Sequence, residues 1–421
     1  MSSVKRDSSD GTSLPPYQKT FHPNSKPDET PEAIVAGMVK RFGESRRNLA
    51  RRMGLRAGKQ MPPEVERFFD AIAAGDWDEI DRQWKPLSMK SGQYDGSQHS
   101  EELDPFWPAV LDAYGVAEQA HMWPAGKLLD YGRAIVDSLR PGMVYVGGTD
   151  PGRWIPEMIN EGTGSEEHVI VTQNAFADSR YVDYMNELYD GRIQTLTGED
   201  SKRAFEEYKK DAQLRLEHDQ QFPNEPKQIR PNENVRLVDG KLEVSGQAAV
   251  MAINERMFQM LLDKNPDAAF AIEQSFPFKS TYASATPLGP IMEVRAEEEN
   301  SLTKERAAQS VEYWRNTAGQ LFSGEGPPLD ETLLQAYSKL AANQADLLGS
   351  RNFPNEAEET YRFAIRIAPG KPEALFGYAN FLAGQNRLQE AVPYVEAAIK
   401  ANPENAALRT LLDDIKRKSG R

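Results

Sequence analysis

The chain of 421 residues contains no cysteine, and this absence excludes several kinds of chemistry at once. Disulfides, thiolate metal sites and cysteine nucleophiles all need the thiol group that the sequence lacks. The sequence also predicts no histidine-based zinc site and no other metal or cofactor, because its histidines are few and no two are three or four residues apart. They are His22, His99, His121, His168 and His218.

Long hydrophobic runs are also missing. The longest apolar segments, such as Met143–Val146, have the length of a β-strand, whereas a membrane-spanning helix needs about 18 consecutive apolar residues. The first residues, from Met1 to Asp7, lack the apolar core of a signal peptide. We therefore expect a cytoplasmic protein as the sequence is written, and a periplasmic location stays open if a leader has been removed before Met1.

Basic residues are in the minority, and the net charge is −14. A nucleic acid is therefore not expected as a partner. Residues 40–59 run against this balance, since they hold many Lys and Arg residues and Glu44 as their one acidic residue. They are interpreted either as a patch for an acidic partner or an anionic lipid surface, or as a solvated helix face that pairs with acidic residues elsewhere. We favour the second interpretation.

Composition and periodicity divide the chain into four regions. Residues 1–30 are polar and have little to bury, which predicts a disordered arm. Residues 31–125 show helical spacing and predict a helical N-terminal region. Residues 126–296 alternate short apolar runs with helical segments, which predicts an α/β domain. Residues 297–421 open with the acidic run Glu297–Glu299 and predict an all-α region.

Short apolar runs in the α/β region predict the strands of one sheet. Met143–Val146, Val169–Thr172 and Ile193–Leu196 are separated by helical segments, which predicts a small, mostly parallel sheet with crossover helices. Two further runs, Ala269–Glu273 and Ile291–Val294, add two possible strands.

A hairpin is predicted inside the same region. Val235–Val238 and Leu242–Val244 are strand-like, and Asp239 and Gly240 between them are typical of a tight turn. Ser245 then offers a hydroxyl that could cap the long helix that follows.

A repeat with a constant period occupies the end of the chain. Ala357 and Ala391 are 34 positions apart, and so are Pro369 and Pro403. The small residues allow two helices to approach closely, and the prolines end the second helix of each unit. A helix–turn–helix unit of 34 residues is the period of the tetratricopeptide (TPR) repeat.

Residues 338–418 therefore resemble the TPR family. Such repeats stack into a concave surface that binds peptides or protein partners, and Tyr378 and Leu382 are candidate partner-binding residues. A purely structural appendage is the alternative interpretation. The resemblance implies two units and a cap helix, at residues 338–371, 372–405 and 406–418.

A glycine-rich turn between a strand and a helix is the first half of a candidate ligand site. Pro156 lacks an N–H, so it predicts a helix start near Gly152–Arg153. A helix N-terminus beside an arginine suits an anion. The segment is neither a Walker loop nor the dinucleotide fingerprint. The candidate ligand-binding residues here are Gly147, Gly148, Asp150, Gly152 and Arg153.

The second half of this site follows the next strand. Neighbouring parallel strands deliver the loops at their carboxyl ends to one crevice, so Gln173, Asn174 and Asp178 could face the same ligand. A sugar or a phosphorylated polar group would suit these side chains. In the alternative interpretation Asp150 and Asp178 are helix caps, and Arg153 only pairs with Asp150.

The same motifs also suggest a family. The order of strand, Gly-Gly-Thr-Asp-Pro-Gly-Arg, helix, strand and Thr-Gln-Asn-Ala-Phe-Ala-Asp resembles a soluble C-terminal region of protein O-mannosyltransferase-like membrane proteins. The likeness covers residues 126–296. The chain lacks that family's membrane helices, which would carry the glycosyl transfer. The resemblance therefore implies an envelope-associated accessory or ligand-binding domain.

Two functions follow from these patterns. The leading hypothesis is a non-enzymatic interaction or scaffold protein, whose repeats hold a protein partner and whose α/β crevice holds a small polar or glycan-like ligand. The rival hypothesis is an enzyme that acts on a sugar or phosphate, with Asp150 or Asp178 as acid or base and Arg153 on the anion.

Overall fold

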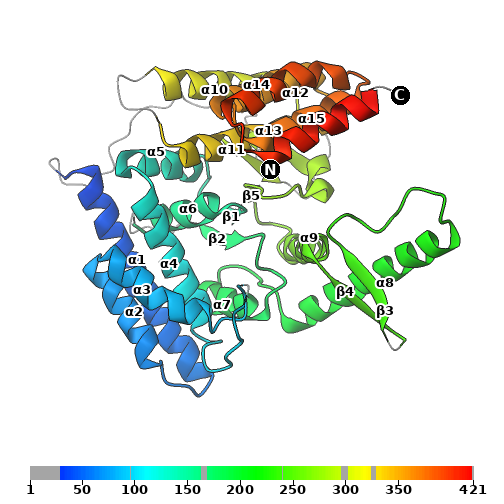
Figure 1. Ribbon diagram of the computed structural model, residues 1–421. Helices are drawn as coiled ribbons and strands as arrows, with labels where there is room; N and C mark the ends of the chain where they lie inside the picture. Colours follow the sequence, from blue (N-terminus) through cyan, green and yellow to red (C-terminus); the bar gives the residue numbers. More distant parts are fainter. Residues whose placement is uncertain are drawn as a thin grey trace, which may run out of the picture.

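The computed structural model describes residues 29–94, 96–162, 168–238, 240–294, 302–323 and 329–419. It is mostly helical and contains one small mixed sheet. Figure 1 shows the sheet near the centre, helices α1–α4 at the lower left, an arm that contains α8 at the right and a stack of helices, α10–α15, at the top. Most of the predicted arm, the run Glu297–Glu299 and Asp239 lie outside the described residues.

Five helices form the N-terminal region. The first, α1, begins after Thr30, whose hydroxyl accepts a hydrogen bond from Ala33 N. It buries Val35, Met38 and Phe42 at helical spacing. The helices are α1 (Pro31–Arg56), α2 (Pro63–Ala74), α3 (Trp77–Ser88), α4 (Trp107–Met122) and α5 (Ala125–Val136).

The basic segment of α1 is paired within the chain. Arg47 and Arg51 both bind the Glu66 carboxylate of α2, and Arg52 and Arg56 both reach Glu187. Of the two interpretations of this segment, the contacts favour a helix face that pairs with acidic residues.

The main sheet is mixed, which corrects the prediction of a mostly parallel one. Its strand order is β2-β1-β5-β7-β6. β1 pairs in parallel with β2 and β5, whereas β7 pairs antiparallel with both β5 and β6. The last two strands meet at a tight turn that contains Gly289, with φ +55°. The strands are β1 (Val144–Gly147), β2 (Val169–Thr172), β5 (Phe270–Ile272), β6 (Ala285–Leu288) and β7 (Ile291–Val294).

The predicted strand Ile193–Leu196 is wrong. This segment is an irregular connection between α7 (Ser179–Tyr189) and α8 (Gly198–Gln221). The backbone of Gln194 makes its hydrogen bonds to the side chain of Asn265 and not to a neighbouring strand. Its N–H donates to Asn265 Oδ1 and its carbonyl accepts from Asn265 Nδ2, both at 2.8 Å.

The helix after β1 begins earlier than predicted. α6 (Asp150–Gly162) starts at Asp150, so Pro156 lies inside it and not in its first turn. A proline inside a helix leaves the carbonyl four residues earlier without its usual donor. That carbonyl belongs to Gly152, and it accepts a 2.6 Å hydrogen bond from the buried Tyr145 hydroxyl.

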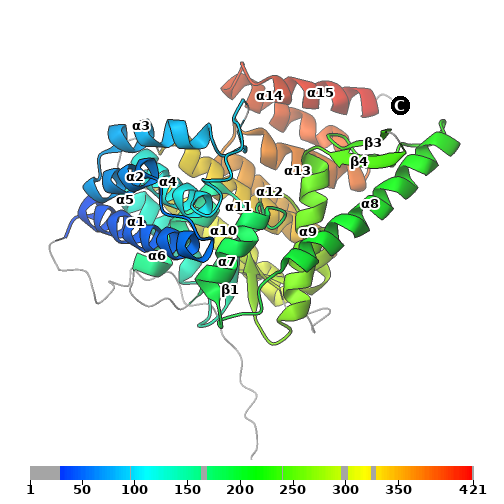
Figure 2. The ribbon, with the colours of Figure 1, turned by 90° about the horizontal axis from the view of Figure 1, so that it is seen from below.

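The predicted hairpin forms a separate two-stranded sheet. β3 (Asn234–Val238) and β4 (Lys241–Ser245) pair antiparallel. Ser245 ends β4 and does not cap the next helix, α9 (Gln247–Lys264), whose N-cap is Gly246 with φ +99°. A Cβ at Gly246 would press on the carbonyl of Asn232, which explains the glycine. In Figures 1 and 2 the hairpin and α8 project together from the body of the protein.

The C-terminal helices form a TPR-type stack that is docked on the sheet. Gln344 of α11 donates hydrogen bonds to the carbonyls of Gly289 and Ile291, at 2.7 and 2.8 Å. The same buried side chain accepts from Ser310 and Trp314 of α10. The helices are α10 (Lys304–Phe322), α11 (Glu331–Ser350), α12 (Pro354–Ile367), α13 (Pro372–Gly384), α14 (Val392–Ala401) and α15 (Ala406–Ser419).

One hydrophobic core joins these parts. It runs from Phe42 of α1 through Tyr145 of β1 to Tyr337 of α11 and Leu408 of α15. Tyr131 of α5 and Tyr337 make an edge contact with ring centres 5.3 Å apart. The repeats are therefore packed on the rest of the chain.

Candidate functional site

The loops after β1, β2 and β5 meet at the carboxyl ends of these strands, as predicted for neighbouring parallel strands. The Asn174 amide donates to the Gly148 carbonyl, and the Ser275 hydroxyl donates to Asn174 Oδ1 at 2.7 Å. Gln173 is fully buried and donates to the Phe276 carbonyl at 3.1 Å. The structure thus brings Gly148, Gln173 and Asn174 together and adds a third loop, that of Ser275.

The start of α6 does hold an anion, and the anion is a side chain of the protein. The Glu273 carboxylate, at the end of β5, accepts hydrogen bonds from Gly148 N at 2.7 Å and Thr149 N at 2.8 Å. The Thr149 hydroxyl donates to its other oxygen at 3.0 Å. Burial raises the pKa of Glu273, and these hydrogen bonds oppose that rise.

The glycines of this turn are needed for the close approach of Glu273. A Cβ atom on Gly148 would lie 2.6 Å from the Glu273 carbonyl oxygen, and one on Gly152 would lie 2.5 Å from Glu273 Cδ. A Cβ on Gly147 would lie 2.6 Å from the Gly152 carbonyl oxygen. In this structure the three glycines therefore admit Glu273 and the first turn of α6.

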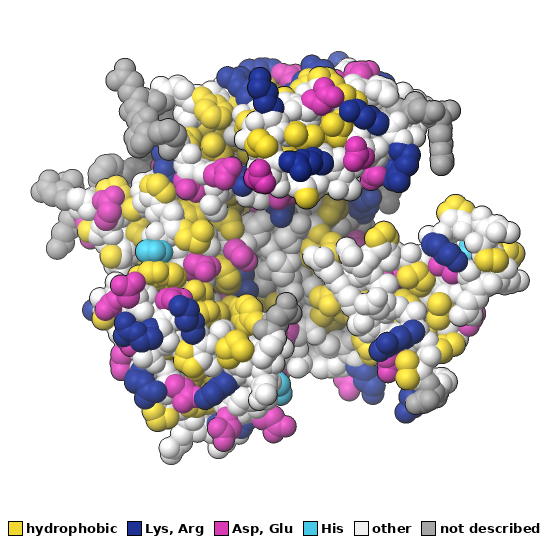
Figure 3. Space-filling model, viewed as in Figure 1, with side chains coloured by type: hydrophobic (Ala, Val, Ile, Leu, Met, Phe, Trp, Pro, Cys, Tyr) yellow, Lys and Arg dark blue, Asp and Glu magenta, His cyan; other side chains and the backbone are white. Residues whose placement is uncertain are grey.

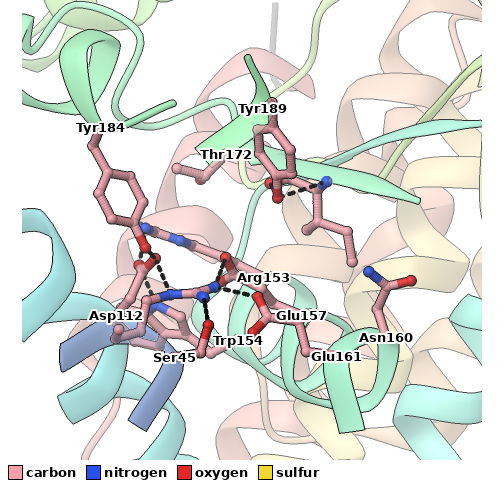
Figure 4. Close-up of polar contacts among 12 residues, drawn as sticks. Ser45, Asp112, Arg153, Trp154, Glu157, Asn160, Glu161, Thr172, Tyr184 and Tyr189 are labelled. Carbon is pink, nitrogen blue, oxygen red and sulfur yellow. Dashed lines mark hydrogen bonds and ion pairs between the residues drawn. The ribbon is translucent and has the colours of Figure 1, made fainter. Parts of the chain in front are cut away.

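Arg153 points away from the crevice. Its guanidinium pairs with Asp112 of α4, which is fully buried, and it also lies over the rings of Trp154 and Tyr181 at 5.4 Å. The predicted pair with Asp150 is absent from the contacts of the described residues. Figure 4 shows Arg153 and Asp112 within a group of buried polar side chains that join α1, α4, α6 and α7.

Arg46 is the second cation of that group. Its fully buried guanidinium lies 2.8 Å from Glu157, 2.6 Å from Glu161 and 3.5 Å from Asp112. The Tyr184 hydroxyl donates to Asp112 as well. Burial, reinforced by the Asp112 charge, raises the pKa of Glu157 to about 8. Such a largely buried network holds the four helices in one arrangement.

The two candidate acids lie in different surroundings. Asp150 is exposed at the start of α6, yet the protein around it displaces enough water to raise its pKa. The charges of Arg153 and Lys339 oppose this rise. Asp178 caps α7 by accepting from Arg180 N at 2.9 Å and also pairs with the Arg180 guanidinium. Its carboxylate also accepts a hydrogen bond from the Gln93 amide at 2.8 Å.

A cavity of about 860 Å³ lies between the crevice and the repeats. Figure 3 shows that this face of the protein is hollowed between the repeat region at the top and the two lower lobes. One wall of the cavity is the segment 275–283, which includes most of the 3-10 helix η1 (Lys279–Ser284), and the other wall is formed by α11 and α13. Lining residues include Ser275, Lys279, Tyr282, Lys339, Asn343 and Asn380.

Tyr378 and Leu382 do not line this cavity. Their exposed fractions are 1% and 0%, and Tyr378 packs on Tyr361 and Phe381. They hold the repeat together, and the residues that α13 presents to the cavity are Glu373, Gly377 and Asn380.

The polar residues of α11 that line the cavity were not predicted, although their spacing in the sequence is a signal. Lys339, Asn343, Asp346 and Ser350 follow one another at intervals of four, three and four residues. Such spacing places them on one face of a helix that is otherwise apolar.

Comparison with known proteins identifies the repeats alone. A family model of the tetratricopeptide repeat matches residues 354–415, which confirms the TPR prediction for α12 to α15. No curated protein and no solved structure shows a significant match to the chain. The resemblance of residues 126–296 to the O-mannosyltransferase-like proteins therefore has no support from known proteins. Among the described helices, none has the length and apolar character needed to cross a membrane.

Proposed function

We propose that the protein is an interaction or scaffold protein that holds a segment of a partner between its repeats and its α/β region. The observation that carries this proposal is the position of the cavity. Its walls come from the inner helices of the TPR-type stack, α11 and α13, and from the loop after β5. A partner segment there would touch both parts of the chain.

The size and the lining of the cavity suit a short stretch of peptide. A volume of about 860 Å³ falls within the range of ordinary ligand sites. Three polar side chains of the lining make no hydrogen bond or ion pair with any described residue, so their N–H groups are available to a ligand. They are those of Lys279, Lys339 and Asn380. An extended peptide presents backbone carbonyls that need such donors.

The walls are tied together before any partner arrives. The Asn343 amide donates to the Gln274 carbonyl at 2.7 Å, and the Arg351 guanidinium donates to the Tyr282 carbonyl at 2.9 Å. Both bonds cross to the segment after β5, one from α11 and one from its C-cap residue Arg351. A preformed site loses less conformational entropy on binding than a flexible one, which favours recognition by this cavity.

Selection of peptides on the full chain tests this proposal. A random peptide library is displayed on phage, and the selected peptides are compared on two variants that each add an arginine. Asn380→Arg places the new side chain in the cavity, whereas Gln320→Arg places it on the exposed side of α10. We expect Asn380→Arg to weaken binding by about tenfold or more and Gln320→Arg to leave it unchanged. Equal affinities for the two variants would refute the proposal.

A second candidate function is the binding or turnover of a small polar or glycan-like ligand at the crevice. The observation in its favour is Asp150, an exposed carboxyl with a raised pKa that follows the glycines of the crevice, Gly147 and Gly148, in the chain. A thermal-shift screen of sugar phosphates and nucleotide sugars tests it, with the unmodified chain and the Asp150→Asn variant measured side by side. Arg153 is unsuitable for this test, because its loss would remove one of the two cations that pair with the buried Asp112.

A further inference from the structure

A group of aromatic side chains lies at the protein surface on α3, α4 and the loop between them, and its inner members pack against the core. Trp77 stacks on His121 with ring centres 4.3 Å apart, and Trp84 stacks on Tyr114 at 3.9 Å. Tyr94 meets the edge of Trp84 at 6.1 Å and is 45% exposed. Trp77 and Tyr114 are half-buried and His121 is exposed, so the aromatic surface formed by Trp77, Tyr94, Tyr114 and His121 is open to solvent.

Two carboxyl groups, Glu118 and Asp150, lie next to this aromatic surface, and the more distant charges of Arg153 and Lys339 act on Asp150. Glu118 of α4 lies close enough to Asp150 and Asp81 for each to raise its pKa, after the larger effect of burial. Asp150 and Glu118 act in the same way on the Tyr94 hydroxyl. Glu118 and Asp150 form no ion pair with any described Lys or Arg.

The arrangement does not suit a metal ion. Among the described residues, no group of three or more His, Asp or Glu side chains is placed to hold one. A cation with a flat, partly apolar body fits better, because aromatic faces attract cations and carboxylates accept their hydrogen bonds. The arginine guanidinium combines these properties, since it is planar, stacks on aromatic rings and donates in pairs to carboxylates.

We propose that the aromatic surface is a docking site for an arginine side chain of a partner protein. The guanidinium stacks on the exposed ring of Tyr94, beside the half-buried Tyr114, and donates hydrogen bonds to Glu118 and Asp150. The argument for this occupant is charge complementarity on an exposed aromatic face. Figure 3 shows acidic and hydrophobic side chains next to one another, together with Lys and Arg side chains, on the part of this face that α3 and α4 form.

The site is independent of the cavity between the repeats and the α/β region. None of its four aromatic residues lines that cavity, and they belong to the N-terminal helices and the loop between them. A partner that occupies the cavity could reach it past Asp150, which interacts with Lys339 on the cavity wall.

The test measures binding of a fluorescein-labelled peptide of alternating glycine and arginine to the full chain by fluorescence anisotropy at low ionic strength. The same peptide with citrulline in place of arginine keeps the shape and removes the charge. We expect the arginine peptide to bind and the citrulline peptide to bind at least about tenfold more weakly. An arginine peptide that does not bind, or a citrulline peptide that binds as tightly, overturns the proposal, and the latter result indicates an uncharged ligand such as a sugar.

Matched variants locate the binding. Glu118→Gln and Tyr94→Leu each remove one element of the site, and Glu207→Gln removes the same charge from the exposed face of α8. We expect about a tenfold loss of affinity for Glu118→Gln, a smaller loss for Tyr94→Leu and no change for Glu207→Gln. Equal losses for the two glutamine variants would mean that only the net charge of the chain attracts the peptide, and they would refute the site. Thermal unfolding of each variant checks that it is folded.

Discussion

The hydroxyl of Tyr145 donates a 2.6 Å hydrogen bond to the carbonyl of Gly152, which is the carbonyl that Pro156 leaves without a donor. Both Tyr145 and the carbonyl are buried. A side chain of β1 thereby repairs the interruption that a proline makes in α6, and it fixes the helix against the strand end where the candidate crevice lies.

Removal of this hydroxyl is expected to destabilise the fold. Tyr145→Phe leaves the Gly152 carbonyl buried without a donor, which should lower the free energy of unfolding by about 1–3 kcal/mol. Urea denaturation measures the change. Adding Pro156→Ala restores a backbone N–H for the same carbonyl, so the double variant should recover part of the loss. Strictly additive effects of the two substitutions would contradict the assignment.

Glu273 is expected to stabilise the fold through its shape and its hydrogen-bond acceptors more than through its charge. Glu273→Ala removes three hydrogen bonds at the start of α6 and should lower the free energy of unfolding by about 2–4 kcal/mol. Glu273→Gln keeps an acceptor for both N–H groups, and its effect should stay within about 1 kcal/mol. Chemical denaturation of the two variants at neutral pH checks the difference, and a glutamine variant as unstable as the alanine variant would show that the charge is required.

The buried charge network predicts a dependence of stability on pH. Burial raises the pKa of Glu157 from 4.5 to about 8, so the folded chain binds this proton more tightly than the unfolded chain. The contribution of Glu157 to stability is therefore present below pH 4.5 and is lost as the pH rises to about 8. Glu157→Gln should reduce the total decline of the unfolding free energy across this pH window by about 1 kcal/mol or more. Glu207→Gln, on the surface of α8, serves as the control, and identical slopes for both variants would contradict the account.

The TPR-type stack should depend on Leu382 for stability. This side chain is fully buried in α13, so Leu382→Ala should lower the free energy of unfolding by about 2–5 kcal/mol. Phe376→Ala, on the exposed side of the same helix, should cost much less. Thermal and urea unfolding compare the two variants. A similar cost for both would mean that the packing of α13 differs from the structure.

The elements that the sequence predicted well are those set by local periodicity. The spacing of Ala357 and Ala391 identifies the repeats because the same helix contact recurs in each unit. The hairpin of β3 and β4 follows from alternation and a turn residue, Gly240. Such signals lie within the hairpin or the repeat units that they specify.

The elements that the sequence did not predict depend on residues far apart in the chain. The occupant of the α6 N-terminus, Glu273, comes more than a hundred residues after Gly148, and Asp112 reaches Arg153 from another helix. The early start of α6 depends on Tyr145, which substitutes for the missing donor of Pro156. Local rules for caps and prolines cannot include such partners, so the contacts of the candidate site required the structure.

The absence of cysteine allows a direct test of the cavity, because a single introduced thiol is the only one in the chain. Asn380→Cys and Gln320→Cys are each labelled with the same bulky maleimide, and the affinity of a peptide selected on the unmodified chain is measured for both. The account predicts that the label at position 380 fills the cavity and abolishes binding, whereas the label at position 320 leaves the affinity unchanged. Undiminished binding by the chain labelled at position 380 would contradict the proposal that the partner lies between the repeats and the α/β region.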